Sequence, residues 1–139
     1  MGDDKQLRED DVTIALEAAV PLSPLAPRAM RAFLEDGLST VGERPLESAQ
    51  LLLSEVLSMS VRHSALPPGT PLHVAVTVSS QVLRIAVEDP GWAAVVPPST
   101  VWDGDAADLG FLLLSYLADR WGVEHGYRSP VVWFELELS

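Results

Sequence analysis

Residues 47–64 read ESAQLLLSEVLSMSVRHS, and the interpretation of the whole chain depends on this stretch. Neither glycine nor proline interrupts it, and a set of apolar side chains recurs at helical spacing: Ala49, Leu52, Leu53 and Val56. The pattern predicts an amphipathic helix that turns these four side chains towards a core.

Three further residues of this helix are spaced four apart, so Glu55, Met59 and His63 lie along one face. Glu55 places a carboxylate in the most apolar part of the helix, and such a group costs free energy to bury unless it is paired or hydrogen-bonded. Two interpretations stay open. Either Glu55 lies on a polar edge while Met59 fills the core, or the two residues belong to a functional face.

Length and composition predict one folded domain. The chain has 139 residues, of which 47% are hydrophobic, so it can bury a substantial core. We expect an acidic, flexible N-terminus over residues 1–10 and a single domain over residues 11–139. No apolar stretch is long enough to span a membrane, and the N-terminus lacks the order of a signal peptide, so a cytoplasmic protein is expected.

The charge balance is strongly acidic, with a formal net charge of −11. A nucleic-acid backbone requires lysines and arginines that this chain does not supply, so nucleic acid is not an expected partner. The acidity either serves solubility or favours a basic protein partner.

The order of predicted elements indicates the fold class. Ser23 followed by Pro24 is typical of a helix start, and that helix should end near Gly37. A third helix, after the central one at residues 47–64, is expected to be capped by Asp105 or Asp108 and to run to about Leu117. Alternating or β-branched runs predict strands over residues 12–18, 72–78, 82–88, 121–123 and 131–138. The order β-α-α-β-β-α-β-β predicts an α+β two-layer sandwich, with helices on one face of a mixed, mostly antiparallel sheet.

Residues 54–64, SEVLSMSVRHS, resemble the N-box helix of the GHKL ATPases, which include gyrase, Hsp90, histidine kinases and MutL. The resemblance is strongest to the small anti-sigma-factor serine kinases of bacterial partner-switching systems, whose helix reads like SELVTNAVRH. There the glutamate polarises a nucleophile, and the asparagine four residues later holds magnesium. The resemblance gives Glu55 the position of the catalytic base, and Met59 replaces the magnesium ligand. His63 matches a histidine common in these relatives.

Two further boxes follow in order, and the resemblance extends over about residues 12–138. Residues 87–92, VEDPGW, are similar to the D-x-G-x-G box, where the aspartate binds the adenine amino group and the first glycine lets the backbone approach the base. Asp89 and Gly91 match this box, whereas Ala93 replaces its second glycine. The resemblance therefore implies the Bergerat (GHKL) fold, with a partly altered adenine site.

The third box is the glycine-rich entry to a helix, which reads GRGLLLVDALADRWGV in close relatives and DLGFLLLSYLADRWGV here, over residues 108–123. Gly110 matches the second glycine, and Asp108 replaces the first. A helix N-terminus binds phosphate through open N–H groups and its positive dipole end. The Asp108 carboxylate would occupy those groups and repel a triphosphate. In the intervening lid, Trp92 and Trp102 either fill the pocket or form an interface.

Three functions are consistent with these residues. The first is a regulatory protein of the anti-sigma-factor type with a degenerate ATP site, acting mainly by protein binding; Met59, Ala93 and Asp108 favour it. The second is an active Mg-ATP-dependent anti-sigma factor and serine kinase, favoured by Glu55, Asp89 and Gly110. The third is an unrelated α+β binding module.

The first function implies little or no kinase activity and no cofactor, and the second implies ATP with magnesium. By the resemblance, the expected partner is a sigma factor or an anti-anti-sigma-like regulator, and a homodimer is possible. Neither nucleic acid nor a membrane is expected as a partner.

Overall fold

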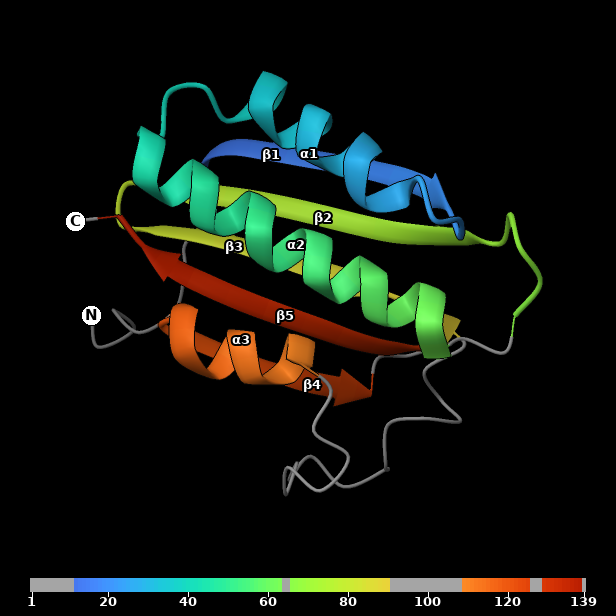
Figure 1. Ribbon diagram of the computed structural model, residues 1–139. Helices are drawn as coiled ribbons and strands as arrows, with labels where there is room; N and C mark the ends of the chain where they lie inside the picture. Colours follow the sequence, from blue (N-terminus) through green and yellow to red (C-terminus); the bar gives the residue numbers. More distant parts are fainter. Residues whose placement is uncertain (1–11, 64–65, 91–108, 126–128, 139) are drawn as a thin grey trace.

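The computed structural model describes residues 12–63, 66–90, 109–125 and 129–138. Within them the chain forms five strands and three helices in the predicted order (Figure 1). The elements are β1 (Val12–Pro21), α1 (Ala26–Gly37), α2 (Glu43–His63), β2 (Pro71–Ser79), β3 (Val82–Glu88), α3 (Leu109–Leu117), β4 (Arg120–His125) and β5 (Pro130–Glu137). The acidic segment at residues 1–10 lies outside the described residues.

The strands form one sheet in the order β1-β2-β3-β5-β4. The α+β sandwich is confirmed, but the four described strand pairings are all antiparallel, so the expectation of a mixed sheet was wrong in this detail. The connection through α3 leaves β3 and β4 pointing the same way, as in a parallel crossover. However, β5 returns between them and pairs antiparallel with each.

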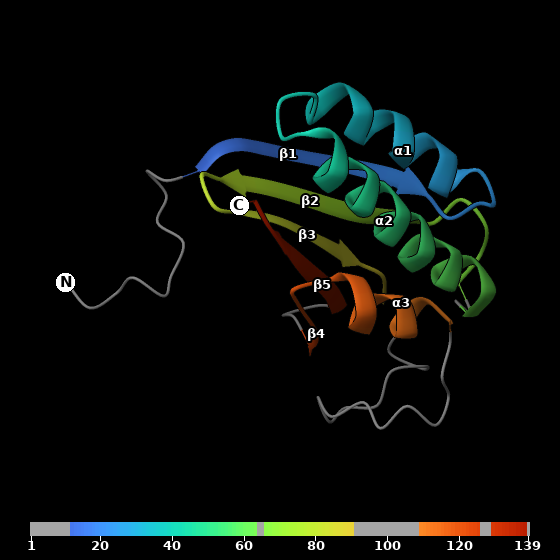
Figure 2. The ribbon, with the colours of Figure 1, turned by 60° about the vertical axis from the view of Figure 1, so that its left-hand side comes forward.

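All three helices lie on the same face of the sheet, as Figures 1 and 2 show from two directions. The core between the layers follows from the period-two alternation of the strands. In β2 the inward side chains are Leu72, Val74, Val76 and Val78, and in β5 they include Val132, Phe134 and Leu136. The same alternation places Trp133 and Glu135 on the opposite face of β5.

Helix α2 occupies the centre of the helix layer. It packs against α1 on one flank and α3 on the other, and it also contacts β3 and β5 of the sheet. The four side chains predicted to face the core are all buried: Ala49, Leu52, Leu53 and Val56. The helix starts at Glu43, four residues before the predicted stretch, and it tolerates Pro45 because a first-turn N–H has no partner within the helix.

The start of α1 differs from the prediction. The helix begins at Ala26, with Pro27 in its first turn, and not directly after Ser23. The Ser23 hydroxyl does accept a hydrogen bond from a backbone N–H, that of Leu25, at 2.9 Å. Ser23 therefore stabilises the turn before the helix. Of the two prolines that follow it, Pro24 and Pro27, only Pro27 lies in the first helical turn.

We predict a large difference between two neighbouring leucines of α2. The Leu53 side chain is 1% exposed and Leu51 is 39% exposed. Leu53→Ala should lower the free energy of unfolding by about 2–5 kcal/mol, because it removes packed methyl groups and leaves a cavity. Leu51→Ala, the matched control, should change it by less than about 0.5 kcal/mol. Urea unfolding followed by circular dichroism measures both values, and equal effects would contradict the core assignment.

Candidate functional site

The side chains predicted to form a site on α2 differ in exposure. Glu55 is partly exposed, Met59 is only 2% exposed, and His63 is exposed at the last residue of the helix. Met59 therefore packs within the hydrophobic core. Of the two interpretations left open by the sequence, the structure places Met59 in the core and Glu55 at its edge.

Asp89 follows β3 directly, and its residue is fully buried, with 0% exposure. Its backbone N–H donates to the carbonyl of Pro130 at 3.3 Å, which ties the end of β3 to the start of β5. The register pairs Glu88 with His73 near the start of β2, and α2 leads into β2. The C-terminal end of α2 and Asp89 therefore lie at the same end of the sheet (Figure 1).

The rest of the predicted nucleotide site is only partly described. Gly110 is the second residue of α3, a helix that packs against α2. Gly91, Ala93, Asp108 and the lid with Trp92 and Trp102 lie outside the described residues. The structure thus packs the helix that carries Gly110 against the helix that carries Glu55, and it places Asp89 at the end of the sheet where α2 ends.

The donor set on α2 does not suit magnesium. Mg²⁺ takes hard oxygen ligands in octahedral geometry, whereas Met59 offers a soft thioether that the core already surrounds. Among the described residues, no cluster of three or more His, Asp or Glu side chains could hold a metal ion. The residue at the magnesium position that the resemblance implies, Met59, therefore does not fit the ion.

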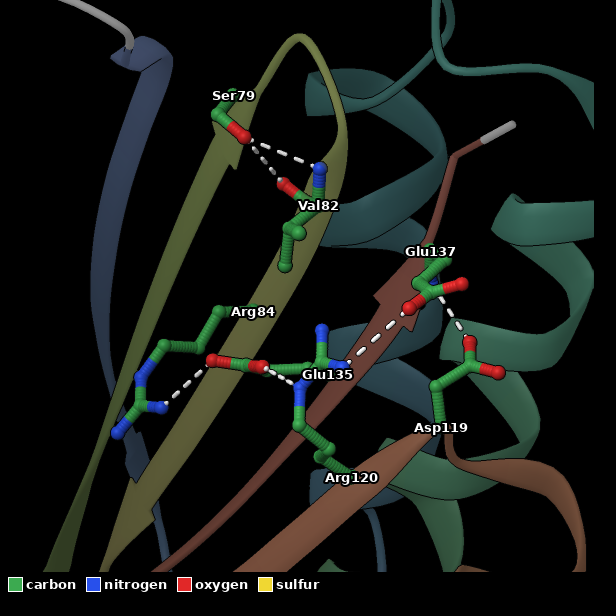
Figure 3. A network of polar contacts seen from close by, with 7 residues as sticks. All are labelled: Ser79, Val82, Arg84, Asp119, Arg120, Glu135 and Glu137. Carbon is green, nitrogen blue, oxygen red and sulfur yellow. Dashed lines mark hydrogen bonds and ion pairs between the residues drawn. The ribbon is translucent and has the colours of Figure 1, made fainter. Parts of the chain in front are cut away.

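A second polar arrangement, which the sequence did not reveal, lies on the face of the sheet that the helices leave open (Figure 3). Glu135 of β5 accepts hydrogen bonds from Arg84 of β3 at 3.0 Å and from Arg120 of β4 at 2.7 Å. Arg120 also donates to Glu137 at 3.3 Å. These ion pairs link three adjacent strands, and only the cross-strand register brings their members together.

The network shifts the pKa values of Arg120 and Glu135. The hydrogen bond to Glu135 is the main cause that raises the pKa of Arg120, and burial opposes it only in part. Burial by itself would raise the pKa of Glu135, but the hydrogen bonds and charges of Arg120 and Arg84 outweigh burial, so the pKa is lowered. Glu135 is therefore held as a carboxylate between two guanidinium groups.

The network continues into an aromatic contact. The Arg84 guanidinium carbon lies 4.4 Å from the centre of the Trp133 ring, within cation–π range. The indole also lies close over Gly122 of β4, where an added Cβ would come within 2.9 Å of it. Gly122 therefore permits Trp133 to lie against the sheet and support Arg84.

Comparison with known proteins identifies the fold. The sequence matches no protein-family model and no characterised protein sequence at a significant level. Solved structures do match. The RsbU and RsbW domains of Rv1364c from Mycobacterium tuberculosis align with 91% of this chain, with 18% identity and a TM-score of 0.69. The histidine kinase domain of a blue-light-activated kinase from Erythrobacter litoralis aligns with 86% of it, with 19% identity and a TM-score of 0.54.

The fold is therefore GHKL-like, as the resemblance in the N-box helix predicted. This chain spans 33% of the Mycobacterium tuberculosis chain and 62% of the Erythrobacter litoralis chain. At such identities the likeness concerns the fold. None of the helices among the described residues has the length and apolar character needed to cross a membrane.

We predict that Glu135 supports stability more than its neighbour Glu137 does. Glu135→Gln should lower the free energy of unfolding by about 1–3 kcal/mol, because the part-buried Arg84 and the exposed Arg120 both lose a charged acceptor. Glu137→Gln is the control. Its side chain is largely exposed, and its ion pair should contribute no more than about 1 kcal/mol.

The effect of Glu135 should depend on pH. Folding lowers the pKa of the Glu135 carboxyl, so the ionised group stabilises the protein fully at pH values above the ordinary pKa of a glutamate. This stabilisation is lost as the pH falls through the lowered pKa of the folded protein. The unfolding free energies of wild type and Glu135→Gln should therefore differ at neutral pH and converge in acid. A difference that stays constant down to strongly acidic pH would contradict this account.

Proposed function

We propose that this chain is a regulatory protein of the anti-sigma-factor type, with a degenerate ATP site, that acts mainly by binding other proteins. The single observation that carries the proposal is Met59, which the fold buries in the core at the helix position where the family has a magnesium ligand. The GHKL-like fold supports the relationship. The partner suggested by the resemblance is a sigma factor or an anti-anti-sigma-like regulator.

The sequence around the phosphate position supports the same proposal. Asp108 stands where relatives have a glycine at the entry to α3. A carboxylate about 4 Å from a phosphate charge, at an effective dielectric near 20, costs on the order of 4 kcal/mol. That cost corresponds to roughly a thousandfold weaker binding of a triphosphate, in addition to the loss of the metal.

An alternative to the fully degenerate site is a site that still binds adenine, and the identity and burial of Asp89 favour it. Asp89 keeps the family's adenine-binding aspartate, and it is fully buried at the end of β3. Glu55 keeps the position of the catalytic base at the edge of α2. An active Mg-ATP-dependent serine kinase would need both residues, but it would also need a magnesium ligand that Met59 does not supply.

Nucleotide binding tests the degenerate site directly. Isothermal titration calorimetry should detect no magnesium-dependent binding of ATP, and the purified protein should show neither ATPase nor serine kinase activity. Micromolar binding of ATP that requires magnesium would overturn the proposal and favour the active kinase.

Metal-independent binding of adenosine or ADP would be compatible with the degenerate site. Asp89→Asn should then weaken that binding strongly, because the amide is uncharged and replaces one carboxylate oxygen with an NH₂ donor that opposes the adenine amino group. Glu88→Gln is the matched control, since Glu88 lines the open face of the sheet and Asp89 is buried at its end.

The proposed partner surface is the exposed side of α1, because family partners dock near the first helix and the lid. Arg28 and Arg31 are both exposed and lie three residues apart, so they can face one acidic partner together. Leu25, which is 68% exposed just before the helix, adds an apolar contact beside them. The lid, residues 92–107, is the second expected surface and lies outside the described residues.

Substitutions on this surface separate protein binding from cleft chemistry. Charge reversal of Arg28 and Arg31 to Glu should weaken capture of the regulatory partner more than Glu55→Ala does. Arg44→Glu, an exposed charge reversal at the start of α2, is the control and should leave capture unchanged. Quantitative pull-down with each purified variant measures how much each substitution weakens capture of the partner. If Glu55→Ala abolishes capture while the α1 variants retain it, the proposal is wrong.

A further inference from the structure

Exposed apolar side chains gather on two neighbouring helices of the outer layer. Five large apolar side chains are exposed among the described residues, and four of them lie on α2 and α3. Leu51 of α2 is 39% exposed, and α3 contributes Leu112 at 45%, Tyr116 at 82% and Leu117 at 40%. The two helices pack against each other, with α1 on the opposite flank of α2 (Figures 1 and 2). We call these four residues the α2–α3 patch.

The sequence of α3 explains why this helix cannot bury all of its apolar surface. Leu109–Leu117 reads LGFLLLSYL and contains no charged residue. Leu114 is fully buried in the core, and Leu113 is partly buried beside it. Leu112 and Tyr116 lie two residues before and after Leu114, so they share the opposite side of the helix. A helix without a polar side is typical of a buried position, so the outer side of α3 lacks a covering element.

The charge beside the α2–α3 patch is mainly negative. Glu47 and Glu55 lie four residues before and after Leu51, so the three side chains form one stripe along the outer side of α2. Glu47 is exposed and Glu55 is partly exposed, and the exposed Asp119 follows α3 by two residues. The cations of α2 lie near its ends, about two and three turns from Leu51: Arg44 and Arg62.

This charge distribution distinguishes between the surfaces that an apolar patch can meet. Anionic lipid headgroups would be repelled by the three carboxylates. A basic protein segment would be attracted by them, and an apolar centre with a charged rim is the usual anatomy of a protein interface. An amphipathic helix has the matching shape, because its narrow apolar stripe can contact two packed helices together while lysines or arginines flank the stripe.

We propose that the α2–α3 patch is a docking site for a basic amphipathic helix of a partner protein. Tyr116 is the central anchor, since exposed tyrosines often dominate the binding energy of an interface, and Glu47 pairs with a cation of the partner. The proposal is independent of the protein-binding function assigned to α1. There Arg28 and Arg31 would meet an acidic partner, so the two flanks of α2 select partner surfaces of opposite charge.

A synthetic probe tests the proposed chemistry. The probe is a fluorescent amphipathic peptide of about 18 residues, long enough to form a helix, with leucines along one side and lysines at both edges of that side. A second peptide has glutamate in place of every lysine. Fluorescence anisotropy should show saturable binding of the lysine peptide to the wild type, and the glutamate peptide should bind at least about tenfold more weakly. Added salt should weaken binding of the lysine peptide.

Two pairs of variants locate the contact. Leu112→Ser combined with Tyr116→Ser should weaken binding of the lysine peptide about tenfold or more, because both apolar anchors are lost. Leu25→Ser is the matched control, since Leu25 is 68% exposed but lies just before α1 on the other flank of α2. Glu47→Lys should also weaken binding, whereas Glu35→Lys makes the same charge change at an exposed position of α1 and should not.

Four results would overturn the proposal: no binding of the lysine peptide, equal binding of both peptides, a Leu25→Ser variant that loses as much affinity as the double variant, or a Glu35→Lys variant that loses as much as Glu47→Lys. The double variant must first give the far-ultraviolet circular dichroism of the wild type. If it does not fold, Tyr116→Ser alone replaces it, because this substitution changes only the most exposed side chain of the patch.

The other possible occupants are tested with the same double variant. Co-sedimentation with phosphatidylglycerol vesicles detects binding to a membrane, and sedimentation velocity detects association with a second copy. Vesicle binding or self-association that the double variant abolishes would assign the patch to that occupant and would overturn the proposal. None of these results depends on Arg28 or Arg31, so failure of this proposal leaves the function assigned to α1 to its own test.

Discussion

The packing of α2 against the sheet is the constraint on which the rest of the structure depends. One side of this helix is buried from Ala49 to Ser60, and each fully buried leucine, valine or methionine contributes about 1.5–3 kcal/mol. With α2 in place, α1 and α3 have only its two flanks to occupy. The Gln50 side chain also donates to the carbonyl of Arg31 at 3.0 Å, which adds a polar contact between α1 and α2.

The same packing determines whether the side chain of Met59 on α2 is available to a metal ion. The resemblance implies a polar metal ligand at this position of α2, which would leave a gap in an otherwise apolar helix side. Met59 closes that gap, since a flexible thioether fills irregular core space well. Stability and metal chemistry thus compete for one side chain, and here the residue serves the core.

The two faces of the molecule support different interactions. The helix layer presents Arg28 and Arg31 on α1, whereas the open face of the sheet presents a network in which Glu135 joins two arginines. Asp119 reinforces this network at its edge. Its backbone N–H donates to the Glu135 carbonyl at 2.9 Å. Its carboxylate accepts the backbone N–H of Glu137 at 2.7 Å (Figure 3). These contacts secure β4 to β5 at the side of the sheet farthest from β1.

The amino-acid sequence by itself determined the type and order of the elements, because helical and strand periodicities are local. The buried side of α2 and the alternation of Val132 and Trp133 along β5 could both be read directly. Only those residues of the candidate site that belong to short sequence motifs could be predicted. Glu55, Met59 and Asp89 were identified by their neighbours in sequence, and the burial of Met59 agreed with its apolar side chain.

Only the tertiary structure decided the strand order, the purely antiparallel pairing of the described strands, and the ion pairs of Glu135 with Arg84 and Arg120. These features join residues far apart in the chain, such as Arg84 and Glu135, which are 51 positions apart. No local pattern records which strand lies beside which. The start of α1 was misplaced for a related reason, because two prolines suit a first turn and the packing of Ala26 selects between them. Register and burial are properties of the assembled sheet, so they arise only when its strands are in place.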